Sequence, residues 1–203
     1  AAIGFGRYQL FVLLIVGFGM AADGCEMFVM SLILPELPES WGLRPTQLGV
    51  LGGGVFLGMA IGSPLGGWLS DRIGRLRVMT ITLSISCTFG LLSAASQGFW
   101  TLLVLRFLFG LGIGGYVPVA NTLFLESSPS EHNGFGIAWS MNLFAAGACL
   151  EALVSAYILP ELGWACLLVM SALPLGLPLL ATPLLGVVES PVWLLSRGRA
   201  QEA

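Results

Sequence analysis

The segment Gly66–Arg77, with the sequence GGWLSDRIGRLR, separates two apolar stretches and decides how the chain folds. Each apolar stretch is long enough to cross a bilayer, which takes about 20 residues. The segment itself carries three arginines and one aspartate, which cannot easily enter hydrocarbon. We therefore predict a tight loop between two membrane spans. Its excess of positive charge predicts that the loop lies on the cytoplasmic side.

The composition is that of an integral membrane protein. Of the 203 residues, 56% are hydrophobic and only 9% are charged, whereas a soluble domain carries about 25% charged residues. All eight basic residues are arginines and no basic face is present, which excludes nucleic acid as a partner. The four cysteines lie in apolar runs without paired spacing. They are interpreted as buried apolar side chains, not as disulfides or metal ligands.

Six membrane spans can be placed along the chain, over residues 10–34, 47–69, 78–96, 101–125, 135–158 and 164–187. The fold class predicted is an all-α membrane protein with six transmembrane helices. Residues 1–188 form the bundle, and residues 189–203 begin a cytoplasmic linker helix. An even number of spans puts both termini on one side. Six arginines share that side and only Arg44 lies opposite, which predicts a multi-pass protein with cytoplasmic termini.

Glycines recur every four residues in two of the spans. This spacing makes a groove along one helix face, where a second backbone can approach closely. The glycines assigned to helix packing are Gly54, Gly58, Gly62, Gly66, Gly110 and Gly114. The string Gly110-x-Gly112-x-x-Gly115 also has dinucleotide-fingerprint spacing, but it follows no predicted strand. Helix packing is therefore the better interpretation.

Four ionisable residues fall inside predicted spans: Asp23, Glu26, Arg106 and Glu151. An ionised side chain at the bilayer centre costs at least about 2.5–3.5 kcal/mol, so these groups should face an interior cavity and have partners. The helical rise places all four roughly 8–16 Å below the outer boundary. Arg106 can neutralise one acid, either Glu151 or Glu26.

One arginine cannot balance three acids, so we hypothesise that Asp23 and Glu26 serve protons or a cationic substrate group. The alternative is a buried ion-pair cluster that only fixes helix packing. Weaker candidates for the same pathway are Asn121, Asn142, Tyr116 and Trp139. Each of them is equally consistent with an interhelical hydrogen bond or an interface anchor.

Several motifs resemble those of the major facilitator superfamily. Gly67–Arg77 is similar to its loop signature G-x-x-x-D-R-x-G-R-[RK]-[RK], and Arg106-x-x-x-Gly110-x-Gly112-x-Gly114 is similar to its fourth-helix motif. Glu189-Ser190-Pro191, followed by Trp193-Leu194-Leu195, resembles the sequence after the sixth helix of sugar-porter-like members. Residues 22–27, 151–153 and 159–164 resemble the branch of synaptic-vesicle-2-related and niacin or organic-ion transporter-like proteins.

The resemblance implies a cytoplasmic charge network. In the family, loop arginines and the acids that end helices four and six latch the outward-open state. Carried over to this sequence, Arg72 and Arg75 would meet Glu126 and Glu189. Asp71 would cap a helix of the other half.

The resemblance also implies a function. The family has two six-helix halves with substrate bound between them, and this chain supplies one half. We expect a secondary active transporter of a small organic ion or polar metabolite, working by alternating access with protons as coupling ion. Its partners would be the substrate, the lipid bilayer and the missing C-terminal six-helix half, unless the chain works as a half-size dimer. The alternative is a non-transporting membrane binding or regulatory protein.

No bound cofactor and no metal are implied. The sequence shows no plausible nucleophile–base pair or metal-ligand set, so we predict that the protein is not an enzyme.

Overall fold

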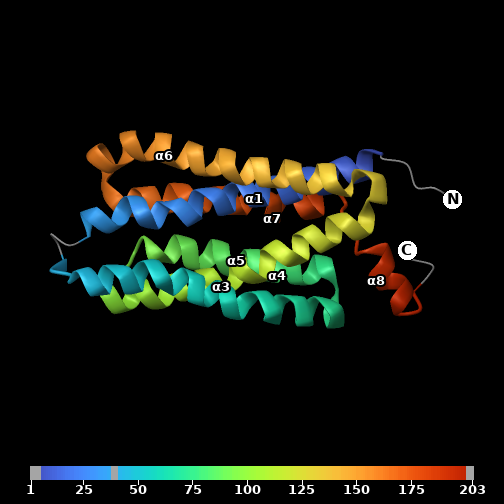
Figure 1. Ribbon diagram of the computed structural model, residues 1–203, viewed down its shortest axis with the longest axis horizontal. Helices are drawn as coiled ribbons and strands as arrows, with labels where there is room; N and C mark the ends of the chain where they lie inside the picture. Colours follow the sequence, from blue (N-terminus) through green and yellow to red (C-terminus); the bar gives the residue numbers. More distant parts are fainter. Residues whose placement is uncertain (1–5, 38–40, 200–203) are drawn as a thin grey trace.

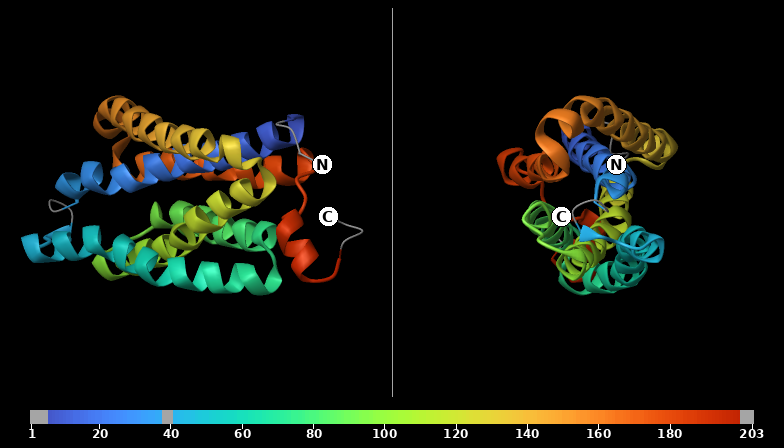
Figure 2. Two further views of the ribbon diagram at one scale, coloured as in Figure 1. Left: turned by 45° about the vertical axis from the view of Figure 1, so that its right-hand side comes forward. Right: turned by 90° about the vertical axis from the view of Figure 1, so that its left-hand side faces the viewer.

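A computed structural model describes residues 6–37 and 41–199, which form a bundle of long helices without a strand in this part of the chain. The helices that cross the bundle lie side by side, and the short helix α8 lies at one end (Figures 1 and 2). The long helices are α1 (Arg7–Ile33), α3 (Pro45–Ile73), α4 (Arg75–Ser93), α5 (Phe99–Ser127) and α6 (Asn133–Ala172), and α7 (Gly176–Leu184) is a helix of nine residues. The short elements are η1 (Leu34–Glu36), η2 (Ser130–His132), η3 (Leu173–Leu175) and α8 (Pro191–Ser196).

Helix α6 holds one complete crossing and the start of the next, which continues through η3 and α7. Its 40 residues would make a straight helix about 60 Å long, twice the thickness of the hydrocarbon core. At Gly163 the backbone leaves the helical region, with φ 77° and ψ 175°. The chain runs to one end of the bundle in α6 and returns through η3 and α7 (Figure 1). Among the described residues, five segments are long and apolar enough to span a membrane, and the fifth, Ser130–Leu184, holds both of these crossings. The prediction of six spans in an all-α fold is therefore confirmed.

The predicted loop around Arg72 and Arg75 differs from the structure. Helix α3 continues to Ile73 and α4 begins at Arg75, so only Gly74 separates them. Gly74 has φ 110°, a conformation that costs glycine little and that other residues rarely adopt. Arg72 therefore lies in the last turn of α3, and Arg75 lies at the start of α4.

The start of α1, the end of α5 and the segment after α7 meet at one end of the bundle. The Tyr8 hydroxyl donates to the Val188 carbonyl at 3.2 Å. The Gln9 amide donates to the Ser127 carbonyl at 3.1 Å. We call this end, which also holds Gly74 and α8, the arginine end. An even number of crossings requires the first and last spans to begin and end at the same end of the bundle. That the arginine end faces the cytoplasm remains a prediction from the arginine distribution.

Two glycine series lie at a single interface between α3 and α5. A Cβ at Gly62 would collide with the backbone of Leu111, and a Cβ at Gly66 would lie 2.6 Å from Gly115 Cα. In the other direction, a Cβ at Gly110 would collide with the backbone of Val55. Lipid supplies no hydrophobic force between helices, so this close backbone packing is what holds the pair together.

A second close crossing joins α1 to α6. A Cβ at Gly24 would collide with the carbonyl of Phe144, and one at Gly147 would collide with the carbonyl of Ala21. The Cys25 thiol lies 3.2 Å from the Gly147 carbonyl at the same crossing. The bundle thus contains two tight helix pairs, α3–α5 and α1–α6.

We expect Gly62→Ala to destabilise the protein by about 1–3 kcal/mol, because the added methyl group forces the α3 and α5 backbones apart. Gly53→Ala is the matched control, since nothing lies within 4 Å of a Cβ at that position of α3. Thermal unfolding of the purified protein in detergent measures both. Equal melting temperatures for the two variants would contradict the packing role.

Candidate functional site

Among the described residues, four acidic or basic side chains are buried within the membrane-spanning helices, and we call them the buried charge cluster. Asp23 and Glu26 come from α1, Arg106 from α5 and Glu151 from α6. Their exposed fractions are 3%, 1%, 0% and 3%. The three helices thus bring ionisable groups into the interior of the bundle, away from the surrounding lipid.

The centre of the cluster is an ion pair between α1 and α5. Arg106 Nη1 lies 2.7 Å from Glu26 Oε2, and both side chains are fully buried. Arg106 Nη2 also lies 3.5 Å from the Gly90 carbonyl of α4. Of the two acids that the sequence offered as partners, Arg106 pairs with Glu26 and not with Glu151. Within the described residues, Glu26 Oε1 and Arg106 Nε have no hydrogen-bond partner, so the pair retains unused polar capacity.

In the part of the chain that the structure describes, neither Asp23 nor Glu151 forms an ion pair with an arginine. Ser171 donates its hydroxyl to Glu151 Oε1. Asp23 is three residues from Glu26 on the same face of α1, and its Oδ1 has no hydrogen-bond partner among the described residues. Arg106 is therefore left to balance three carboxyl groups.

The weaker candidates lie outside this cluster, with one exception. The exception is Tyr116, which is fully buried and faces α1 at Gly19, one turn from Asp23. Asn142 is exposed and donates to the Ala138 carbonyl of its own helix at 2.8 Å. Asn121 is half-buried and Trp139 is exposed.

The arginine end holds a second charged group, centred on Arg75. Its guanidinium makes a two-pronged contact with Glu126, with Nε–Oε2 and Nη2–Oε1 distances of 3.1 and 3.2 Å. Its Nη1 lies 3.0 Å from Asp71 Oδ1. The Ser190 hydroxyl donates to the same Glu126 carboxylate. These contacts tie the ends of α3, α4 and α5 to the segment after α7, and we call them the Arg75 network.

Arg72 and Glu189 differ from what the resemblance implies. The Arg72 guanidinium lies 4.0 Å from the centre of the Trp68 ring, and not against Glu126 or Glu189. The Glu189 carboxylate accepts from the Leu76 N–H at 2.9 Å, at the N-terminus of α4. A carboxylate is favoured there because the first N–H groups of a helix have no partner within it. Since α4 begins one residue after Gly74, its N–H groups are available to Glu189.

Comparisons with known proteins agree with this arrangement. The family model of the Major Facilitator Superfamily matches residues 10–201. The chain belongs to the Major Facilitator Superfamily. The family and the apolar helices make it an integral, multi-pass membrane protein, and the prediction that it is not an enzyme is confirmed.

Two superfamily relatives are much longer than this chain. Synaptic vesicle 2-related protein of Xenopus laevis is 38% identical over 176 residues, which cover 87% of this chain and 32% of the relative. Organic cation/carnitine transporter 7 of Arabidopsis thaliana is 36% identical over 202 residues, which cover 100% of this chain and 40% of the relative. The chain thus spans less than half the length of either relative.

The fold matches solved superfamily structures. The xylose transporter XylE of E. coli, in a partially occluded inward-open conformation, superposes with a TM-score of 0.87. The match covers 97% of this chain and 54% of XylE at 21% sequence identity. This establishes the fold, which is half of a major-facilitator fold.

Several residues that contact the buried charge cluster or the Arg75 network could not be predicted from the sequence. Ser171, in the part of α6 after the kink at Gly163, and Gly90, in the apolar part of α4, contact the buried charge cluster from segments that contain no charged residue. Ser190 caps α8, where its hydroxyl accepts from the Trp193 N–H at 3.2 Å. The only available signal is the Ser-Pro pair at 190–191, which is typical of a helix start.

We expect Glu26→Gln to destabilise the protein by about 3–5 kcal/mol, because it leaves the Arg106 charge buried without a partner. The double variant Glu26→Gln/Arg106→Met should recover most of this loss. Glu151→Gln is the control, since that carboxyl group has no arginine partner. Thermal unfolding measures all three, and equal losses for Glu26→Gln and Glu151→Gln would rule out the assigned pairing.

We expect Arg75→Gln to loosen the arginine end by about 1–3 kcal/mol, because it removes the charge-assisted hydrogen bonds to Glu126. Amide hydrogen exchange should then rise in residues 187–196. Arg72→Gln is the matched control, because that side chain contacts Trp68 instead. Faster exchange in the Arg72 variant than in the Arg75 variant would contradict the network described here.

Proposed function

We propose that the protein is a secondary active transporter of a small organic cation, coupled to protons, and that Asp23 and Glu151 bind the proton or the cationic group in turn. The observation that carries the proposal is the excess of acids over arginines in the buried charge cluster. Arg106 is engaged by Glu26 at 2.7 Å. The two remaining carboxyl groups lie among buried helices, where an uncompensated negative charge is costly.

Two features support a cation as the substrate. Buried carboxyl groups without an arginine attract a proton or a cation and repel an anion. One relative at 36% identity carries the name organic cation/carnitine transporter 7. The same features are also compatible with other small organic ions and polar metabolites as substrates.

The proposed cycle needs a second six-helix half. Superfamily carriers bind substrate near the bilayer midplane, between two halves that rock against each other. The chain corresponds to 54% of XylE and would serve as the N-terminal half, over residues 1–188. Residues 189–203 would begin the linker to the other half. Both termini of the chain would be cytoplasmic, as the arginine distribution predicts. The Arg75 network would hold one of the two states.

We expect Asp23→Asn to reduce uptake driven by a pH gradient by at least about tenfold, because a proton-transferring group typically contributes more than that. The assay is uptake of a radiolabelled organic cation by the full-length protein in proteoliposomes. Glu36→Gln is the matched control, since this exposed acid lies just beyond the end of α1.

Exchange at equal pH separates the two roles of Asp23. Preserved exchange assigns Asp23 to proton coupling, and loss of exchange assigns it to cation binding. Unchanged uptake and an unchanged pH profile would contradict the proposal. Saturable binding of the cation without flux would instead favour a non-transporting binding protein.

A further inference from the structure

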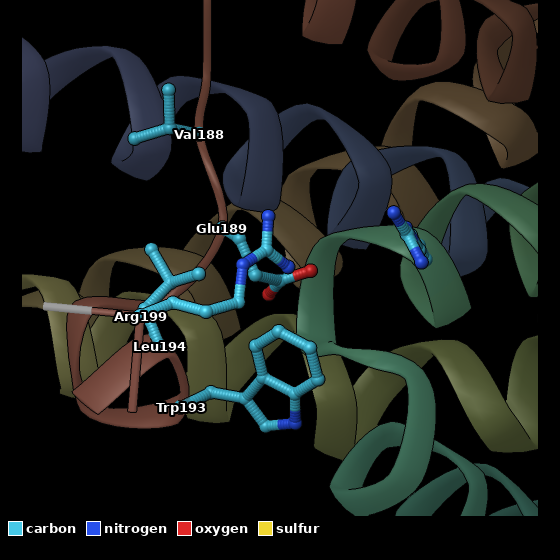
Figure 3. Close-up of a pocket in the computed structure, with 6 residues that line it drawn as sticks. Val188, Glu189, Trp193, Leu194 and Arg199 are labelled. Carbon is cyan, nitrogen blue, oxygen red and sulfur yellow. The ribbon is translucent and has the colours of Figure 1, made fainter. Parts of the chain in front are cut away.

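Two adjoining cavities lie at the arginine end, on the side of the bundle where α4 and α7 pack together. The first has a volume of about 380 Å³ and is lined by Arg77, Val188, Glu189, Trp193, Leu194 and Arg199 (Figure 3). The second has a volume of about 530 Å³ and runs between α4 and α7, past Thr80, Ile81 and Leu179. Arg77 lines both, so the two cavities are neighbours that share one side chain. Each is in the size range of small-molecule sites in proteins.

The first cavity is polar and carries a net positive charge. Arg77 and Arg199 supply two guanidinium groups, and Glu189 supplies one carboxylate. Figure 3 shows the side chains of Glu189, Arg199 and Trp193 pointing toward one another. The Glu189 carboxylate is engaged by the Leu76 and Ser190 N–H groups, at 2.9 and 3.0 Å. Among the charged side chains that line this cavity, two arginines outnumber one carboxylate.

The second cavity is apolar and lies within the membrane-spanning part of the bundle. Leu179 and Pro183 line it from α7, and Ile81, which is 44% exposed, lines it from α4. A groove of this kind, next to bilayer hydrocarbon, accepts an acyl chain without losing any hydrogen bond. A soluble anion would occupy only the polar cavity and leave the apolar one unfilled.

We propose that these cavities together bind one anionic phospholipid. Its phosphate and headgroup lie between Arg77 and Arg199 beside Trp193, and one acyl chain follows the groove between α4 and α7. Charge complementarity selects the anionic headgroup, as in basic pockets between membrane helices that bind acidic lipids. The indole of Trp193 suits the boundary between headgroup and hydrocarbon.

Bound lipid would act on the Arg75 network. Arg77 belongs to the first turn of α4, and Trp193 belongs to α8, where its indole donates to the Asp71 carbonyl at 3.1 Å. A headgroup held by Arg77 and Arg199 therefore joins α4 to the end of α8. Acidic lipid should stabilise the same arrangement of helix ends that the contact between Arg75 and Glu126 holds.

Native mass spectrometry of the full-length protein, extracted from nanodiscs, tests the proposal. The probes are phosphatidylglycerol and phosphatidylcholine with the same acyl chains. We expect one tightly retained phosphatidylglycerol and no equivalent phosphatidylcholine. Arg77→Gln and Arg199→Gln should each weaken retention by about fivefold, the contribution expected of one arginine. Arg7→Gln is the charge-matched control, because this exposed arginine at the same end lines neither cavity.

Two further arms keep the test decisive. Arg77→Lys retains the positive charge and should bind the lipid within about twofold of the native protein. If that variant loses the lipid although it folds, the electrostatic assignment is wrong. Thr80→Phe fills the apolar groove and should lower lipid retention while the arginines remain. Equal retention of both lipids, displacement by millimolar inorganic phosphate, or insensitivity to both arginine variants would overturn the proposal.

Discussion

The ion pair between Glu26 and Arg106 joins the two tight helix pairs of this bundle, α1–α6 and α3–α5. The α3–α5 pair is held by one glycine interface and the α1–α6 pair by another. The 2.7 Å contact links α1 of one pair to α5 of the other, with both side chains fully buried. Because lipid does not drive helices together, such polar contacts and close backbone packing determine how the pairs are arranged.

The same ion pair explains why other carboxyl groups in the interior are available to bind a proton or a cation. A buried arginine satisfied by one carboxylate leaves further carboxyl groups in its surroundings without a cation. Asp23 of α1 and Glu151 of α6 occupy this position, and both are buried. A site that lacks a fixed cation is one that a proton or a cationic ligand can complete, and the occupant can be exchanged during a cycle.

At the arginine end, in contrast, the charged side chains meet at the ends of helices, near water. Gly74 lets α3 pass directly into α4, which places Arg75 against Glu126 and frees the first N–H groups of α4 for Glu189. The arrangement also leaves Arg77 exposed, beside the segment after α7. One glycine thus sets both the Arg75 network and the cavity that we assign to a phospholipid.

The sequence by itself determined the class of protein, the six crossings and the list of buried charges. These follow from local properties, since the length of an apolar run and the cost of a charge in hydrocarbon do not depend on neighbouring helices. The tertiary structure alone decided that Arg106 pairs with Glu26, that Arg72 stacks on Trp68, and that Ser171 and Gly90 contact the cluster. Partner choice depends on how far helices rotate and slide against each other. Contacts such as that between Gly24 and Phe144 set this rotation and translation, and no periodic pattern in the chain predicts them.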